Sequence, residues 1–283
     1  MASDGVDVDL LAEAVTDHLA AVQPAIDELS VCTLGASITS VVMRASLRRQ
    51  AESLTAIGRL VASDEGFAAV PLLRPACEEL IVGRYLALVS PSQSDAILQA
   101  CAVKQVAHSL AAQRAMVGDD VIERLGLTDY LLRSTSKSEA ADENFTRLRV
   151  ELGWPAFRQA PGLPSTKWMA RKTGSLDLYE YLFHATSRTV HFSVAELLRR
   201  AWYRDDGEIT ISSSQFERHW AAFALYEGSL LLAETAIVVW NVLESLGEGA
   251  PFDSLEQAAV LSATERIGKH GRVPIITALE LAT

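Results

Sequence analysis

The stretch of sequence that decides the fold is WAAFALYEGSLLLAETAIVVW, residues 220–240. It is almost continuously apolar and long enough to cross a bilayer as a helix. It also carries Glu227 and Glu234, and a carboxylate near the centre of a bilayer costs roughly 2.5–3.5 kcal/mol. We therefore predict that it forms the central helix of a soluble helical bundle, within a helical segment over 214–246, and that the protein has no membrane partner.

The sequence on both sides of this stretch predicts further helices. Apolar residues recur at helical spacing through most of the chain, whereas strand-like alternation is confined to 208–212, which has no obvious partner. The expected helices cover residues 7–29, 37–63, 67–89, 92–116, 138–152, 175–191 and 254–267. The helix that begins near Ser175 either ends at His191 or continues to about residue 203. These segments predict an all-α fold with more than about half of the residues in helices.

One segment interrupts the helical pattern. Residues 153–174, GWPAFRQAPGLPSTKWMARKTG, contain three prolines and three glycines, which disfavour a long helix. Strongly apolar helices are expected on both sides of it, and 283 residues suit one large helical domain. We expect one domain over 1–283, a single large helical bundle with an irregular basic loop at 153–174 and a histidine-bearing helix at 175–203.

The net charge and the cysteine content restrict which partners and which cellular compartment we expect for this protein. The formal net charge of −11 opposes non-specific binding to nucleic acid or to anionic membranes, so a nucleic-acid role would need a local basic patch. The three cysteines, Cys32, Cys77 and Cys101, form no CxxC pair, which is typical of a reduced compartment. The N-terminus lacks the basic and apolar regions of a signal peptide. The expected location is the cytoplasm.

Several common catalytic motifs are missing from the sequence. It has no GxxxxGK[ST] phosphate loop, no GxGxxG after a strand, no HExxH and no GxSxG. It also lacks the Glu-x-x-His pair that holds a carboxylate-bridged metal in a helical bundle. We expect no metal and no cofactor.

A first polar constellation lies in PLLRPACEELIVGRYLALV. Arg74 and Glu78 are four residues apart and share a helix face in apolar surroundings. A partly buried guanidinium is tolerated mainly when a carboxylate pairs with it. The pair either fixes the register of the helix or belongs to a functional pocket.

A second constellation lies in LDLYEYLFHATSRTVHFS. Glu180, His184, Ser187 and His191 follow at intervals of four, three and four, which places them on one helical stripe, with Arg188 beside it. Histidine exchanges protons near neutral pH, and arginine stabilises a phosphorane-like anion. The alternative is an exposed polar face without chemistry.

A third set recurs at heptad spacing in the long apolar helix. Glu227, Glu234 and Asn241 share one face, because seven residues span nearly two helical turns. They form either a narrow solvent-exposed stripe or an internal group facing Arg74 or the histidine stripe.

The 153–174 segment adds basic and aromatic side chains. The basic residues carry four positive charges with no acid among them, and three aromatic residues are interleaved. This combination suits phosphate contact and base stacking, and it equally suits a loop pinned to the acidic surface of the protein itself. On the first alternative, we expect a mobile lid or anion guide that borders His191. The residues are Arg158, Lys167, Arg171 and Lys172, with Trp154, Phe157 and Trp168.

Two of these motifs carry a family resemblance. LLRPACEEL in one helix and YLFHATSRTVHFS in a later one resemble an uncharacterised group of bacterial helical proteins with an Arg-plus-acid helix and a later Tyr…Ser…Val-His-x-Ser element. That group is distantly similar to the HEPN superfamily of helical bundles, many of which are RNases of toxin and phage-defence systems while others are non-catalytic. The resemblance covers about residues 74–193 and implies a role for His191 and Arg188.

The leading functional hypothesis is therefore a HEPN-like, metal-independent endoribonuclease, or its inactive relative, in bacterial stress or phage defence, with RNA as the partner. The expected catalytic residues are His191 as general acid or base, Arg188 or Arg74 at the phosphate, and Glu78 orienting the arginine. We predict that Arg74 and Glu78 lie near His191, with Glu234 as a further member. The expected substrate-binding residues are Arg158, Lys167, Arg171, Lys172, Ser187 and His184.

Two alternatives come from other functional classes. The first is a protein that binds a small ligand, such as an anionic one, in a polar pocket without chemistry. The second is a structural or regulatory helical partner, such as a homodimer. A closed pocket too small for a nucleotide would favour the first of these, and a large exposed apolar patch would favour the second.

Overall fold

The computed structural model describes residues 6–157, 160–191, 193–203, 206–214, 216–248 and 254–276. Helices occupy most of this part of the chain, so the all-α prediction is confirmed. The elements are α1 (Val8–Leu29), α2 (Ile38–Ala62), α3 (Gly66–Ala69), η1 (Val70–Leu72), α4 (Leu73–Leu86), α5 (Pro91–Val117), α6 (Asp119–Arg124), α7 (Thr128–Glu151), α8 (Thr166–Lys172), α9 (Leu176–Val190), α10 (Val194–Leu198), β1 (Ala201–Tyr203), β2 (Ile209–Ile211), α11 (Glu217–Ser245) and α12 (Ser254–Gly268).

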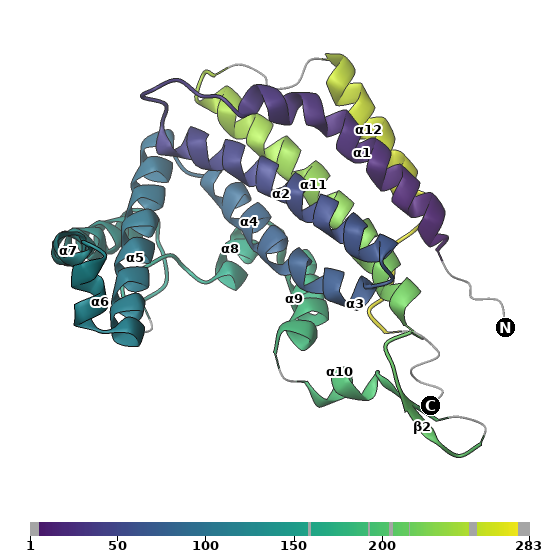
Figure 1. The fold of residues 1–283 in the computed structure, drawn as a ribbon. Coiled ribbons are helices and arrows are strands. Elements are labelled where there is room, and N and C mark those ends of the chain that lie inside the picture. Colours follow the sequence, from purple (N-terminus) through teal and green to yellow (C-terminus); the bar gives the residue numbers. More distant parts are fainter. Residues whose placement is uncertain are drawn as a thin grey trace.

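Helix α11 is the central element of the bundle. Helices α1, α2 and α4 run alongside it, and α12 packs on α1 and α11 (Figure 1). Most of its side chains are buried, because neighbouring helices cover nearly its whole circumference. At Gly228 an added Cβ would lie 3.0 Å from Leu54 Cδ1, so the missing side chain allows α2 to approach α11 closely.

By length and composition alone, α11 could cross a membrane. The rest of the chain buries 83% of its most apolar stretch. Such burial is what a core helix of a bundle shows, and it agrees with the role that the apolar stretch predicts for this helix.

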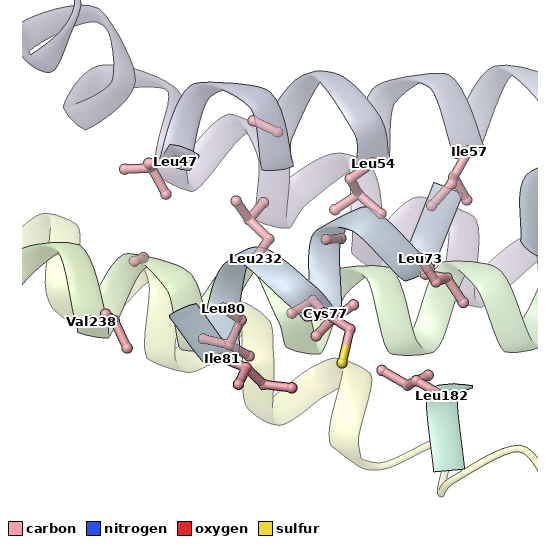
Figure 2. Packing of buried hydrophobic residues seen from close by; sticks show 14 of the residues in the cluster. Leu47, Leu54, Ile57, Leu73, Cys77, Leu80, Ile81, Leu182, Leu232 and Val238 are labelled. Carbon is pink, nitrogen blue, oxygen red and sulfur yellow. The ribbon is translucent and has the colours of Figure 1, made fainter. Parts of the chain in front are cut away.

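The core lies where α2, α4 and α11 meet, with α9 closing one side. Figure 2 shows leucine and isoleucine side chains of α2 and α4 pointing toward α11, and Leu182 of α9 approaching Cys77. Leu47, Leu80 and Ile81 are completely or almost completely shielded from water. Burying each such side chain contributes about 1.5–3 kcal/mol, so packing rather than helix propensity holds these helices together.

Helices α5 and α7 form a separate pair at one side of the bundle. They pack on each other and α5 also contacts α2, while their far ends and α6 extend away from the other helices (Figure 1). The capping box at Ser90 and Gln93 fixes where α5 begins. Lys104 of α5 donates to Asp142 of α7 at 2.8 Å, which ties the two helices together.

The prediction that the histidine-bearing helix continues to about residue 203 is wrong. Helix α9 ends at Val190, because His191 takes an extended conformation with φ −109° and ψ 160°. The chain then forms the short helix α10 and turns into β1. Strand β1 pairs antiparallel with β2, with Ala201 opposite Ile211, and so supplies the partner that the strand-like pattern at 208–212 lacks in the sequence.

The described residues of 153–174 are not one irregular loop, because they include the short helix α8. Ser165 caps the seven-residue helix α8 by accepting a hydrogen bond from the backbone of Trp168. Trp154 is buried and donates to the hydroxyl of Tyr85 on α4, and Trp168 packs edge-on against the same ring at 5.7 Å. The prolines therefore prevent a long helix, as predicted, while the aromatic residues attach the segment to α4.

Candidate functional site

The first polar cluster joins α4 to α9. Arg74 Nε donates to Glu78 Oε1 at 3.1 Å, and Arg74 Nη1 donates to Ser187 Oγ at 3.1 Å. The guanidinium also stacks on the ring of Phe183 at 4.6 Å. The Arg74 side chain is 24% exposed and Glu78 is 40% exposed, so water still reaches the ion pair. We call Arg74, Glu78 and Ser187 the α4–α9 cluster.

The histidine stripe of α9 does not enter this cluster as a whole. Ser187 points toward α4, whereas His184 and His191 are exposed and Arg188 is half-buried. His191 is the C-cap residue, and its backbone nitrogen donates to Ser187 O at 3.0 Å. The structure therefore places His191 one turn beyond the residue that Arg74 contacts, with its ring in solvent.

The cavity behind the α4–α9 cluster is very small. Its volume is about 10 Å³, at the lower limit for a single water molecule. Burial, with Glu78 and Glu227 nearby, raises the pKa of the Cys77 thiol in its wall to about 12, so Cys77 stays protonated and is a poor nucleophile. No nucleotide fits inside, and any ligand of this cluster must lie on its exposed side. The lining residues are Arg74, Cys77, Glu78, Tyr179, Leu182, Phe183 and Thr186.

The described basic residues of 153–174 lie on α8, which packs on α4 and α9. Lys167 Nζ pairs with Glu180 Oε1 at 2.8 Å, and this ion pair lowers the pKa of Glu180. Arg171 and Lys172 are exposed on α8, and Lys172 lies 5.3 Å from the centre of the Trp168 ring. Arg158, the remaining predicted member, lies outside the described residues.

Tyr179 connects α8 with the α4–α9 cluster. Burial raises the pKa of its hydroxyl, the charge of Glu78 raises it further, and the charges of Arg74 and Lys167 oppose the rise. Its ring also lies 5.4 Å from that of Phe183. The basic helix α8 and the cluster thus act on the same side chain and border one another.

The three heptad-spaced polar residues of α11 lie in three different environments. Glu227 is completely buried, and its Oε1 accepts from Arg272 Nε at 3.0 Å. Glu234 pairs with Arg84 of α4, and Asn241 is exposed. The set is therefore neither one solvent-exposed stripe nor one internal group.

The expectation that Glu234 joins Arg74 is wrong. Its partner Arg84 lies ten residues beyond Arg74, which corresponds to about 15 Å along the α4 axis. Two arginines of one helix thus serve two separate polar sites.

A second, larger cavity lies between the ion pairs of α11. Its volume is about 220 Å³, and its wall combines two carboxylates and two guanidinium groups with the Ser175 hydroxyl. Arg84 Nη1 donates to Ser175 Oγ at 2.7 Å, which ties α4 to the start of α9. We call this space the charged cavity. Its lining residues are Arg84, Gly174, Ser175, Leu178, Glu227, Leu230, Leu231, Glu234 and Arg272.

The segment that carries Arg272 is fixed in place by α9. The hydroxyl of Tyr181 donates to the backbone oxygen of Val273, and the Arg272 guanidinium lies 5.2 Å from the Tyr181 ring centre. Half of the Arg272 side chain remains exposed. Because Glu227 is shielded from water, burial raises the pKa of its carboxyl to about 7, although Arg272 acts in the opposite direction.

An apolar groove continues from the charged cavity between α11 and α12. It has a volume of about 200 Å³ and shares Leu230 and Glu234 with the charged cavity. The remaining lining residues are almost all apolar. They are Ala233, Ala236, Ile237, Trp240, Gln257, Val260, Leu261 and Thr264.

Glu227 and Glu234 stand out in the sequence, whereas nothing in it marks Arg84, Ser175 and Arg272 as members of this site. Arg84 stands on the same helix as the first polar pair, yet no acid follows it at helical spacing. Its partner is 150 residues away, and Arg272 lies in a short C-terminal stretch with no recognisable pattern. Among the residues that the structure describes, no group of three or more histidine, cysteine or acidic side chains is arranged to hold a metal ion.

The fold and these sites define a class of protein: an all-α bundle with charged groups held between its helices. Within that class, the chain belongs to a family of unknown function, DUF5677, whose model matches residues 41–209. The matched range includes Arg74, Arg84 and His191 and ends before α11. No curated protein and no solved structure matches the chain.

Proposed function

We propose that this protein binds a small molecule in the charged cavity between α4, α9 and α11. The observation that carries the proposal is the cavity of about 220 Å³ beside the buried carboxylate of Glu227. An engineered cavity of about 150 Å³ accommodates benzene, so the space is large enough for a small ligand. Pockets that bind small molecules typically combine apolar walls with a few fixed polar groups, and this wall does so.

The surrounding contacts make the cavity a preorganised site. Arg84 is held by Ser175 and Glu234, and Arg272 is held by Glu227 and an aromatic ring of α9. Side chains already fixed by their own neighbours lose little conformational entropy when a ligand arrives. The space behind the α4–α9 cluster, in contrast, is about 10 Å³ and holds at most one water molecule, so of these two spaces only the charged cavity has room for a small ligand.

Filling the cavity tests this proposal. Leu230→Trp places a larger side chain in the wall shared by the charged cavity and the apolar groove, and Val106→Trp adds the same side chain to an exposed position of α5. A panel of cationic, anionic and neutral small molecules is screened by thermal shift and ligand-observed NMR. Hits should bind the wild type and the Val106→Trp variant and should not bind Leu230→Trp. If no class binds, the proposal is wrong.

We propose, as a second candidate, that the exposed side of the α4–α9 cluster contacts RNA, as in a HEPN-like metal-independent RNase or its inactive relative in bacterial defence. The hydrogen bond from Arg74 to Ser187 favours it, because it holds a guanidinium beside the helical turn that carries Arg188 and His191. In this hypothesis, His191 takes the proton of the RNA 2′-hydroxyl. The 2′-oxygen then attacks phosphorus and the bond to the 5′-oxygen breaks. The proton held by His191 passes to the leaving 5′-oxygen, directly or through water, giving a cyclic phosphate and a free 5′-hydroxyl.

Cleavage of end-labelled RNA in EDTA tests this second candidate. His191→Ala should abolish cleavage while retaining RNA binding, and His108→Ala on α5 is the matched exposed control. Replacing Lys167, Arg171 and Lys172 with alanine should reduce the salt dependence of binding, by a slope of about 0.7 for each phosphate that the variant no longer neutralises. Binding without cleavage would indicate an inactive relative. A protein that neither binds nor cuts RNA at low salt would eliminate this candidate.

A further inference from the structure

One oxygen of the Glu227 carboxylate is left without a partner. Oε1 accepts from Arg272, whereas Oε2 is buried and has no hydrogen-bond partner among the described residues. A buried carboxylate oxygen without a donor is costly, because desolvation of a charged group exceeds what one hydrogen bond returns. Glu227 lines the charged cavity, so a molecule in that space can supply the missing donor.

None of the hydrogen bonds that the guanidinium groups of the described wall make reaches Glu227 Oε2. Arg84 donates to Ser175 and to Glu234, and Arg272 donates to Glu227 Oε1. The two guanidinium groups and the two carboxylates balance in formal charge. Among the buried side-chain polar atoms of the described wall, the one without a hydrogen-bond partner is an acceptor, which favours a ligand that brings a hydrogen-bond donor. A positively charged donor is favoured, since charge-assisted hydrogen bonds are roughly twice as strong as neutral ones.

The apolar groove favours a ligand that also carries an apolar part. It begins at Leu230, three positions beyond Glu227 on α11 or about 4.5 Å along the axis, and it passes Ile237 and Trp240. Its walls offer apolar surface from both α11 and α12, including the exposed side chains of Ile237 and Leu261. A molecule anchored at Glu227 can thus bury an alkyl or aryl body in the groove.

We propose that the charged cavity and the apolar groove together bind a small amphipathic amine. Its ammonium group donates to Glu227 Oε2, and its apolar body lies between α11 and α12. This inference rests on the proposed ligand-binding function and names the chemical class of the ligand. It is independent of any RNA contact at the α4–α9 cluster.

Octylamine, octanoate and octanol are suitable probes, because they share one chain and differ in the head group. Binding is measured by calorimetry at pH 8, where the Glu227 carboxyl, with its pKa of about 7, is mostly ionised. The wild type should bind octylamine at least tenfold more tightly than either other probe. Glu227→Gln keeps the shape of the side chain and should weaken octylamine binding at least tenfold. Ile237→Ser should weaken it severalfold.

Controls separate the ligand class from the binding function itself. Leu132→Ser changes an exposed leucine on α7 and should leave octylamine binding unchanged. If octanoate binds best and Leu230→Trp abolishes that binding, the cavity is a ligand site and the amine inference is wrong. Octylamine binding that is insensitive to Glu227→Gln and Ile237→Ser also overturns the inference. If no probe and no compound of the wider panel binds, both the inference and the proposed function fail.

Discussion

The two arginines of α4 lie in contrasting surroundings. Arg74 pairs with Glu78 on its own helix, and the space behind this pair is about 10 Å³. Arg84 pairs with Glu234 of α11 beside a cavity of about 220 Å³ that also contains the buried Glu227. The two ion pairs are similarly exposed, so what differs is the space beside them: one helix has almost no cavity at its start and the wall of a ligand-sized cavity at its end.

The two sites differ in how strongly burial affects the energy of their charged groups. At the α4–α9 cluster, water screens the ion pair, and such pairs typically contribute about 0–1 kcal/mol to stability. At the charged cavity, Glu227 has lost its hydration, so its ionisation is linked to folding. Variants at the two sites should therefore differ both in the size of their effect and in its dependence on pH.

The largest expected effect is the contribution of Glu227 to the pH dependence of stability. Burial raises the pKa of its carboxyl from 4.5 to about 7, so the folded state binds a proton more readily than the unfolded state between these values. The contribution is fully present below pH 4.5 and is lost as the pH rises through 7, by about 3 kcal/mol. Urea unfolding of the wild type and Glu227→Gln from pH 4.5 to 8 measures it as a difference between the two proteins.

The comparison with Glu227→Gln is needed because another buried group changes the stability with pH in the opposite direction. His18 on α1 is completely buried, and burial lowers its pKa to about 4. This group reduces stability as the pH falls from 6.5 toward 4 in both proteins, and its effect cancels in the difference. A difference that stays constant with pH would show that Glu227 does not titrate in this range.

A smaller effect is expected for the counter-ion of Glu227. Arg272→Ala leaves the carboxylate buried without its cation, so the free energy of unfolding should fall by about 2 kcal/mol at pH 8.5. At pH 6 the loss should be much smaller, because the carboxyl is then protonated. Denaturant titrations at both pH values measure this, with Arg272→Lys as the charge-retaining control. An equal loss at both values would mean that packing of the arginine, not its charge, is responsible.

A substitution in the α4–α9 cluster should lower the free energy of unfolding by less than Arg272→Ala does, and the loss should not depend on pH. Arg74→Ala removes the hydrogen bond to Ser187, the partly exposed pair with Glu78 and the stacking on Phe183. The free energy of unfolding should fall by about 1 kcal/mol at both pH 6 and pH 8.5. Arg74→Lys, which retains the charge, should recover part of it. A loss above that of Arg272→Ala at pH 8.5 would reverse the contrast between the two sites.

The smallest effect is expected where α8 meets α9. Lys167 and Glu180 are each nearly half exposed, so Lys167→Ala should change the free energy of unfolding less than Arg74→Ala does. The change should disappear in 1 M NaCl, where the Debye length is about 3 Å. Thermal unfolding at low and high salt checks this. A large loss that persists at high salt would show that α8 is held mainly by charge buried from solvent.

How well the sequence predicts each site depends on how far apart the residues of that site lie in the chain. Arg74 and Glu78 are four residues apart, and helical geometry places them together before any tertiary contact forms. The sequence predicts that Arg74 and Glu78 lie near His191, whereas the structure brings Ser187 of the same helix against Arg74 and leaves the side chain of His191 exposed. Helix α9 ends at Val190, and this local change of direction is not encoded in a proline or glycine.

The sequence by itself determined the helical class, the central position of α11 and the interruption at 153–174, because these depend on local periodicity and on residues that disfavour helices. Only the tertiary structure decided which charges meet. Arg84 finds Glu234, and Arg272 finds Glu227, across 150 and 45 positions of the chain. Buried polar groups must find partners wherever packing brings the helices together, and that choice depends on the whole bundle. The charged cavity exists for the same reason, since its walls come from α4, α9, α11 and the segment after α12.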